Sequence, residues 1–156
     1  MAMDNMGLVR RYIEEVWNKG NLGVIDELVS DKFVGVEPVI GEVRGLNALR
    51  EQVQAFRGAF PDLRLTIDDI GTTGDRVFTR WTARGTHRGI FMGIPPTNNR
   101  GEVHGITIDR IAGGKLVEHH ESYDSLQFLQ LMGAVPPLDR LMKGQGVGQP
   151  AARPQA

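Results

Sequence analysis

Apolar residues recur at helical spacing in the first third of the chain. Over residues 4–19 they lie three or four positions apart, and Gly20 ends the segment. The same spacing returns over residues 45–60, where Pro61 prevents the helix from continuing, and a shorter helix can follow Asn21. The pattern therefore predicts three helices before any long strand.

The apolar pattern changes to a period of two in the second half of the chain. Residues 63–67 alternate, and residues 77–83 are rich in β-branched and aromatic side chains, which predicts a hairpin. Residues 103–111 and 116–123 flank the turn residues Gly113-Gly114 and predict a second hairpin. This half of the chain is therefore expected to form most of a sheet.

The remaining segments are short or irregular. Residues 33–36 are typical of a short strand, and the glycines and prolines of residues 85–100 predict an irregular connection between two strands. A last helix is expected from Ser125 to Gly133. Helices followed by strands predict an α+β domain, in which a curved antiparallel sheet packs on the N-terminal helices as a cone with a concave pocket.

The length of the chain, 156 residues, is typical of a single domain. Hydrophobic residues make up 40% and charged residues 24%, which is ordinary for a globular protein. We expect the folded domain over residues 1–134. Residues 135–156 are expected to be a largely flexible extension, because residues 144–156 offer too little apolar surface to offset the entropy lost on ordering.

Charge and hydropathy narrow the choice of partners. The formal net charge is −1, and neither sign is gathered into a long block, so we expect neither nucleic acid nor a membrane surface as a partner. No stretch approaches the roughly 18 apolar residues that a membrane span needs. Residues 1–5 lack the basic flank of a secretory signal, so a cytoplasmic location is expected.

Several chemistries lack the residues that they require. The chain has no cysteine, which excludes thiol nucleophiles and disulfides. His119 and His120 are adjacent, so on a strand they point to opposite faces and cannot share a metal ion. Gly85, Gly89 and Gly93 are not followed by a phosphate-binding lysine. We therefore expect neither a metal nor a cofactor.

The strand predicted before residue 124 carries the most suggestive polar side chains. A period of two places His119, Glu121 and Tyr123 on one face. A three-residue turn with a glycine bulge would pair odd positions with odd ones, adding Thr107 and Asp109 to that face. Half-buried in an apolar bowl, this set suits proton transfer, because desolvation raises a carboxyl pKa from about 4.3 toward neutrality.

Other interpretations of these residues stay open. The opposite face of the same strand is also polar, which is typical of an edge strand or a subunit interface. His87 lies in the glycine-rich connection and can be a surface residue or a local hydrogen-bonding group. Arg80 can stack on Trp81 at the surface or reach into the pocket to stabilise an oxyanion.

An ordered set of short motifs resembles the SnoaL-like polyketide cyclase or ester cyclase family over about residues 6–133. The motifs are Phe60-Pro61-Asp62-Leu63, Arg80-Trp81-Thr82, Gly85-Thr86-His87-Arg88-Gly89, Gly93-Ile94-Pro95-Pro96-Thr97, Gly114-Lys115-Leu116-Val117-Glu118-His119, Asp124 and Leu131-Met132-Gly133. The resemblance implies the α+β cone shared with nuclear transport factor 2.

The resemblance also implies an activity, an intramolecular aldol ring closure that needs no cofactor. The catalytic aspartate of the family, two positions after its histidine, falls on Glu121, which keeps the carboxylate with a reach one methylene longer. The assisting histidine of the family falls on Thr107. Two further departures are His120, where many relatives have tryptophan, and Asn98, where many have glycine.

These observations support a cyclase or isomerase acting on a small hydrophobic carbonyl substrate. Glu121 is the expected general acid and base, with His119 orienting it or donating to a substrate oxygen. The expected substrate-binding residues are His87, Thr107, Tyr123, Trp81, Arg80 and Asp109. One alternative is an epoxide hydrolase that uses Asp109, Glu121 and Arg80, and another is a non-catalytic binding or dimerisation module. We expect a homodimer formed through the outer face of the sheet.

Overall fold

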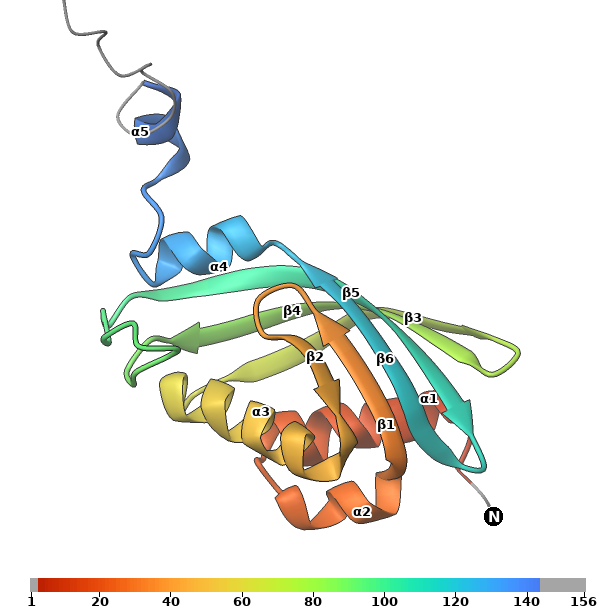
Figure 1. The fold of residues 1–156 in the computed structure, drawn as a ribbon. Helices are drawn as coiled ribbons and strands as arrows, with labels where there is room; N and C mark the ends of the chain where they lie inside the picture. The colour runs from red at the N-terminus through yellow and green to blue at the C-terminus, as the bar shows by residue number, and fades with distance from the viewer. Residues whose placement is uncertain (1–2, 144–156) are drawn as a thin grey trace, which may run out of the picture.

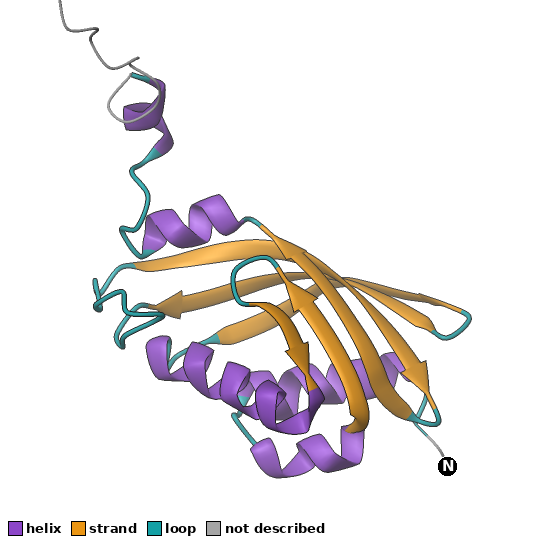
Figure 2. Cartoon of the chain, in the orientation of Figure 1, coloured by secondary structure: helices purple, strands orange, loops and turns teal. Residues whose placement is uncertain are grey.

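Six strands form one curved sheet in the computed structural model, which describes residues 3–143 (Figure 1). The strands are β1 (Val29–Glu37), β2 (Gly41–Arg44), β3 (Arg64–Thr73), β4 (Arg76–Thr86), β5 (Arg100–Ala112) and β6 (Lys115–Tyr123), in the spatial order β2-β1-β6-β5-β4-β3. The sheet curves around the helices on its concave face (Figure 2). The predicted α+β cone is thereby confirmed.

The helical segments lie in the first 59 residues, where β1 and β2 interrupt them, and after β6. They are α1 (Asn5–Arg11), the π-helix η1 (Tyr12–Asn18), the 3₁₀ turn η2 (Leu22–Val24), α2 (Ile25–Leu28), α3 (Gly45–Ala59), α4 (Ser125–Leu131) and α5 (Leu138–Met142). The nine-residue strand β1 precedes α3, so the prediction of three helices before any long strand is wrong. The flexible tail expected over residues 144–156 lies outside the described residues.

The sheet is mixed rather than antiparallel throughout, because β1 pairs in parallel with β6. β6 is consequently flanked by β1 on one side and β5 on the other. A strand in the interior of a sheet has no free edge, so the edge-strand interpretation of β6 is wrong. The polar side chains of β6 instead divide between the concave face and the outer face.

The β5–β6 hairpin reaches its predicted pairing by a different route. Its turn has two residues, Gly113-Gly114, both with positive φ (59° and 74°), a conformation that glycine adopts without strain. The register then shifts by one residue, leaving Val117 as a bulge. Beyond the bulge Asp109 pairs with His119, Thr107 with Glu121 and Gly105 with Tyr123. Odd positions therefore share a face, as the sequence predicted.

The first helical segment changes from α to π geometry partway along. Asp4 caps α1 by accepting a hydrogen bond from the Gly7 backbone N–H at 2.6 Å. In η1 the bonds lengthen to i→i+5, as between the Lys19 N–H and the Glu14 carbonyl at 3.0 Å. Such wide turns are rare and often lie at functional sites.

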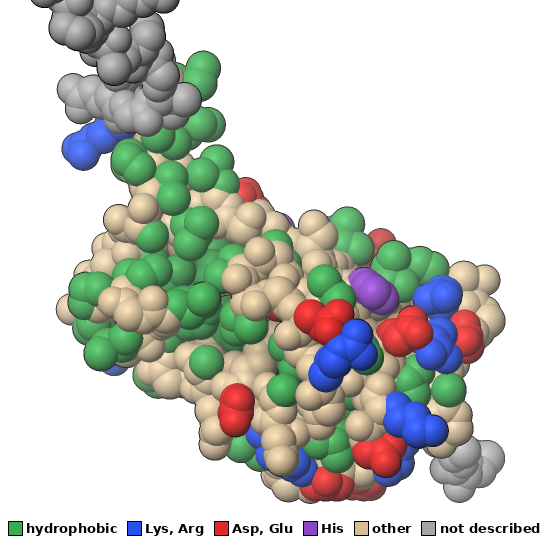
Figure 3. All heavy atoms as spheres, in the orientation of Figure 1, with side chains coloured by type: hydrophobic (Ala, Val, Ile, Leu, Met, Phe, Trp, Pro, Cys, Tyr) green, Lys and Arg blue, Asp and Glu red, His purple; other side chains and the backbone are tan. Residues whose placement is uncertain are grey.

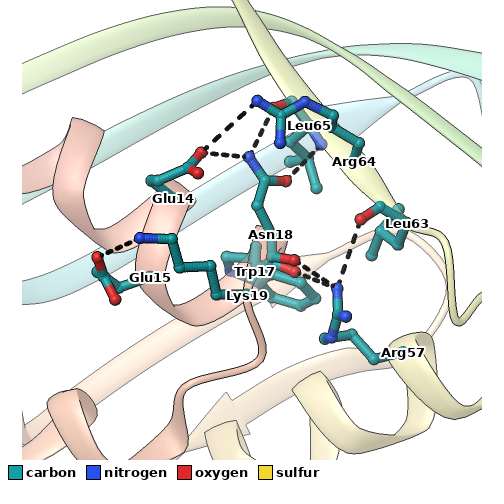
Figure 4. Close-up of polar contacts among 9 residues, drawn as sticks. All are labelled: Glu14, Glu15, Trp17, Asn18, Lys19, Arg57, Leu63, Arg64 and Leu65. Carbon is teal, nitrogen blue, oxygen red and sulfur yellow. Dashed lines mark hydrogen bonds and ion pairs between the residues drawn. The ribbon is translucent and has the colours of Figure 1, made fainter.

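Polar contacts fix η1 against β3 and α3 (Figure 4). The Asn18 amide pairs with the Leu65 backbone in both directions, donating to its carbonyl at 3.0 Å and accepting from its N–H at 2.7 Å. Arg57 of α3 donates to the carbonyls of Trp17 and Asn18 at 2.8 and 3.0 Å. The Arg57 bonds pair carbonyl groups at the end of the π-helix, and the Asn18 bonds pair the backbone of β3.

Two apolar clusters fill the space between the sheet and the helices. The larger joins α1, η1, α2 and α3 to the sheet and includes the buried side chains of Val16, Ile25 and Leu116. The smaller joins the end of α3 to α4 and includes Phe91 and Phe128. Among the described helices, none is long and apolar enough to cross a membrane.

Candidate active site

A cavity of about 100 Å³ lies between the concave face of the sheet and the helices η1, α3 and α4. Most of its lining is apolar and aromatic, with Trp17, Phe56, Phe60 and Phe128 contributed by the helices and their ends. Figure 3 shows apolar side chains gathered in a hollow between α4 and α3. An apolar cavity with a few polar groups is typical of a site for a small hydrophobic molecule.

The sheet register brings the polar lining residues together. Residues two apart on a strand share a face, so neighbouring strands contribute side chains in rows. One row contains Thr79 of β4, Thr107 of β5 and Glu121 of β6. The next row, nearer the β5–β6 turn, contains Val77, Asp109 and His119. Two carboxylates and an imidazole therefore lie in adjacent rows on the concave face.

His119 lies between the two carboxylates. Its Nδ1 is 2.6 Å from Asp109 Oδ1, and its Nε2 is 3.6 Å from Glu121 Oε2. The side chains of Asp109, His119 and Glu121 are 3%, 14% and 15% exposed. Burial alone would lower the pKa of His119, but the charge and hydrogen bond of Asp109, together with Glu121, outweigh burial and raise it to about 10. His119 is therefore an imidazolium at neutral pH and acts as a donor.

Aromatic rings hold the His119 ring in place. The Tyr12 ring meets it edge-on with 6.4 Å between ring centroids, and the Phe33 ring lies at the same centroid distance. Gly35, which pairs with His119 across β1 and β6, makes room for this packing, because a Cβ there would lie 3.0 Å from the Phe33 ring. Strand β1, the neighbour of β6, thus helps to hold the His119 ring through Phe33.

Trp81 forms one wall of the cavity and is positioned by a glycine. The row next to Glu121 pairs Trp81 of β4 with Gly105 of β5. A Cβ at position 105 would overlap the indole ring, so the absence of a side chain lets the ring lie across the neighbouring strand. In this position Trp81 Nε1 donates to Thr107 Oγ1 at 2.9 Å.

The Tyr123 ring lines the cavity, but its hydroxyl is engaged elsewhere. It donates to Glu37 Oε2 at 2.6 Å. The buried Glu37 carboxylate also accepts the backbone N–H groups of Val39 and Gly41, both at 3.2 Å, and that of Ile40. Burial and the Glu37 hydrogen bond raise the pKa of Tyr123, so the phenol stays protonated. No local pattern pointed to Glu37, because its partners come from a distant strand and a tight turn.

Two of the expected substrate-binding residues lie away from the cavity. Arg80 immediately precedes Trp81, so it faces outward, where its side chain is 58% exposed and 3.9 Å from Asp68. His87 follows the last residue of β4 and is fully buried in the smaller cluster, stacked on Phe60. Its Nδ1 lies 3.1 Å from Thr97 Oγ1, and burial lowers its pKa. The structure thus corrects the placement of Arg80 and His87.

The other expected site residues do line the cavity. They are Trp81, Thr107, Asp109, His119, Glu121 and Tyr123. Sequence reasoning missed Tyr12 and Thr79, whose buried side chains also line it. Tyr12 belongs to the apolar stripe of its helix, and Thr79 lies two positions before Trp81 on the same face of β4. The helical and strand periods therefore placed both residues in the interior, without marking them as site residues. No group of three metal-ligating side chains was found within residues 3–143.

The site is thus an apolar cavity inside an α+β cone, with an imidazole between two carboxylates on the concave face of the sheet. The chain belongs to the SnoaL-like polyketide cyclase family, whose model matches residues 7–131.

Solved structures similar to this chain support the assignment. It is 30% identical to IdmH of Streptomyces antibioticus, described as a candidate polyketide cyclase, with 84% of this chain and 99% of that one covered and a TM-score of 0.73. AclR of Streptomyces galilaeus, described as a candidate hydroxylase, is also 30% identical, with 84% and 96% covered and a TM-score of 0.73.

A SnoaL-like protein from Jannaschia sp. CCS1 shares the fold, with 24% identity, 85% and 93% coverage and a TM-score of 0.77. A comparison with curated proteins found no match.

Proposed function

We propose that the protein is a cofactor-independent cyclase or isomerase of hydrophobic carbonyl compounds, with Glu121 as its general base and acid. The observation that carries this proposal is the placement of Glu121 beside the His119 imidazolium within an apolar cavity. Family membership supports the reaction class, as does the similarity to candidate polyketide cyclases. A ketone-containing ring system is the substrate class that this lining favours.

Glu121 begins the reaction by taking a proton from a carbon next to a carbonyl group. The electron pair of the broken C–H bond moves onto the carbonyl oxygen, which gives an enolate. As the general base, Glu121 acts as a carboxylate and carries one negative charge before this step. Proton transfer moves that charge to the substrate, where the imidazolium stabilises it without rearranging.

Ring closure follows within the same molecule. The enolate carbon attacks a second carbonyl carbon, a C–C bond forms, and the electron pair of that carbonyl moves to its oxygen. The oxygen then takes the proton back from Glu121, so atoms and charge balance without a further reactant. His119, as an imidazolium, donates a hydrogen bond and does not serve as the base. The route therefore needs no second histidine, and Thr107 can occupy the position where the family has one.

The outward orientation of Arg80 argues against the epoxide hydrolase alternative. That hypothesis needs a guanidinium inside the cavity beside the two carboxylates, whereas Arg80 lies on the outer face. A binding module without catalysis needs just the apolar lining, and the proposed experiment separates it from an enzyme.

The proposal is tested by deuterium exchange into 2-tetralone, a bicyclic ketone with an activated C–H bond, followed by NMR in D₂O. We expect the wild-type protein to accelerate exchange and the Glu121→Gln variant to lose at least about 100-fold of that acceleration, because a general base contributes this much. Glu118→Gln is the matched control, since Glu118 lies on the outer face of the same strand. Equal acceleration by the wild-type protein and Glu121→Gln, at unchanged thermal stability, would exclude Glu121 as the base, whereas no acceleration by the wild-type protein would identify a binding module.

We also propose that two copies of the chain associate through the outer face of the sheet. Phe78 and Ile106 are exposed there, 38% and 55% respectively, on the side opposite α1, η1 and α3. The net charge of −1 produces little repulsion between copies. Sedimentation should show a dimer at micromolar concentration, which Ile106→Glu converts to a monomer. A wild-type monomer would contradict this assignment.

A further inference from the structure

Two buried hydroxyl groups in the cavity lack hydrogen-bond partners. The Tyr12 hydroxyl and Thr79 Oγ1 make no hydrogen bond to any described residue, although Tyr12 is 2% and Thr79 1% exposed. Both residues line the cavity. Most buried polar side-chain atoms in proteins are paired, so an unpaired one needs an explanation. Two such groups on one cavity point to a ligand that pairs them.

Both hydroxyl groups border the proposed catalytic side chains. Thr79 is in the same row as Thr107 and Glu121, across neighbouring strands. The Tyr12 ring packs edge-on against His119. Thr107 already accepts a hydrogen bond from Trp81. The Tyr12 ring is therefore next to His119, and Thr79 lies in the Glu121 row with Thr107 between them.

The backbone that carries Tyr12 is tied to the rest of the fold by hydrogen bonds at the other end of its helix. Tyr12 is the first residue of the π-helix η1, whose other end is tied to Leu65 through Asn18 and to Arg57 of α3 (Figure 4). Burial raises the pKa of the Tyr12 phenol more than the indole N–H of Trp17 lowers it, and the charges of Asp109 and Glu121 raise it further. Because an indole can approach the phenol oxygen only as a donor, the O–H of Tyr12 is still left without an acceptor. Tyr12 therefore presents a protonated phenol, a hydrogen-bond donor, at a fixed position.

We propose that Tyr12 and Thr79 form a binding site for the oxygen atom of a cyclic ketone, which they hold by hydrogen bonds while the adjacent C–H bond faces Glu121. This inference rests on the proposed function, because it places the oxygen that becomes the enolate. A hydrocarbon of the same shape leaves both hydroxyls unpaired, so the site discriminates by oxygen as well as by shape.

The test uses 4-nitrophenol as an analogue of the enolate, in the Glu121→Gln protein, where a neutral side chain stands for the protonated base. Quenching of the cavity tryptophans gives the dissociation constant, and absorbance gives the ionised fraction of the bound phenol. We expect the bound phenol to be more ionised than the free phenol at the same pH. Adding Tyr12→Phe should weaken binding by about tenfold or more and restore the spectrum of the neutral phenol.

Thr79→Val should weaken binding by about threefold, in keeping with a weaker neutral donor. Nitrobenzene, which lacks the hydroxyl, is the control ligand, and its affinity should not change in either variant. The melting temperature of Tyr12→Phe should stay level or rise, because the substitution removes an unpaired buried hydroxyl and keeps the ring. A merely structural tyrosine would instead lose stability.

The outcomes separate this inference from the proposed function. If Tyr12→Phe and Thr79→Val leave 4-nitrophenol binding and its spectrum unchanged, or if the phenol does not bind at millimolar concentration, the oxygen site is wrong. Loss of deuterium exchange in Glu121→Gln would still uphold the base. If both substitutions weaken 4-nitrophenol but the wild-type protein exchanges no deuterium, the oxygen site holds and the assigned base is wrong.

Discussion

The two faces of the β5–β6 pair carry similar residues in different surroundings. On the concave face Asp109, His119 and Glu121 are enclosed by aromatic rings. On the outer face, one residue along each strand, Arg110 and Glu118 form an ion pair at 2.8 Å with about a third of each side chain exposed. Exposed pairs contribute little because water screens them, whereas a buried charge depends on its partner. Residue type alone therefore does not mark the site.

Removing one inner carboxylate should have the largest effect. Asp109→Asn leaves the His119 imidazolium without its closest counter-charge inside the protein. We expect a loss of about 4 kcal/mol in unfolding free energy, measured by urea denaturation, together with loss of deuterium exchange.

The outer counterpart of this substitution is Glu118→Gln, which should cost less than about 1 kcal/mol. Equal losses from Asp109→Asn and Glu118→Gln would show that the two faces do not differ as described.

The second-largest difference between the two faces should be the pH dependence of the unfolding free energy. The pKa of His119 is raised to about 10 in the folded protein, above its ordinary value of 6.5. Its charge therefore contributes stability that is fully present below pH 6.5 and is lost as the pH rises toward 10. We expect the wild-type protein to lose a few kcal/mol relative to His119→Gln across this window.

The control for this titration is His120→Gln, on the outer face, which should retain the wild-type slope because His119 is still present. Unfolding by urea at successive pH values makes the measurement. A parallel course of the wild-type protein and His119→Gln from pH 6.5 to 10 would contradict the buried imidazolium.

A smaller effect is expected from a glycine on the concave face. Gly105→Ala places a methyl group where the Trp81 indole lies, which should displace the ring from Thr107 and cost about 2 kcal/mol. Gly71→Ala is the matched control, since a Cβ at that strand position meets no atom within 4 Å. Tryptophan fluorescence and urea denaturation report both changes. An unchanged emission spectrum for Gly105→Ala would show that the indole is not held in this way.

Local patterns predicted the concave face but not what surrounds it. Period two placed Thr107, Asp109, His119, Glu121 and Tyr123 together, because strand alternation depends on neighbouring residues alone. The parallel pairing of β1 with β6 joins segments more than 80 residues apart, and no local signal encodes it.

The error in the length of β1 comes from its connection to β2. Residues 33–36 were interpreted as a short strand that Pro38 ends, whereas β1 runs to Glu37 and residues 38–40 form the turn to its partner β2. Arg80 was an expected substrate-binding residue, but it is adjacent to the cavity residue Trp81 on β4, and adjacent strand residues face opposite ways. The apolar stripe of the helix predicts that the Tyr12 ring is buried. That its hydroxyl has no hydrogen-bond partner depends on the whole fold and cannot be predicted from this stripe.

Val117 has a consequence for how such a site can change. Without the Val117 bulge, pairing from the Gly113-Gly114 turn would set Glu118 opposite Asp109 and His120 opposite Thr107. Every side chain of β6 beyond the turn would then point to the other face of the sheet. The chain therefore encodes two acid–histidine sets back to back, and a single unpaired residue selects which one is internal. A family built on this hairpin can exchange its internal chemistry by moving one bulge, without altering any residue that performs it.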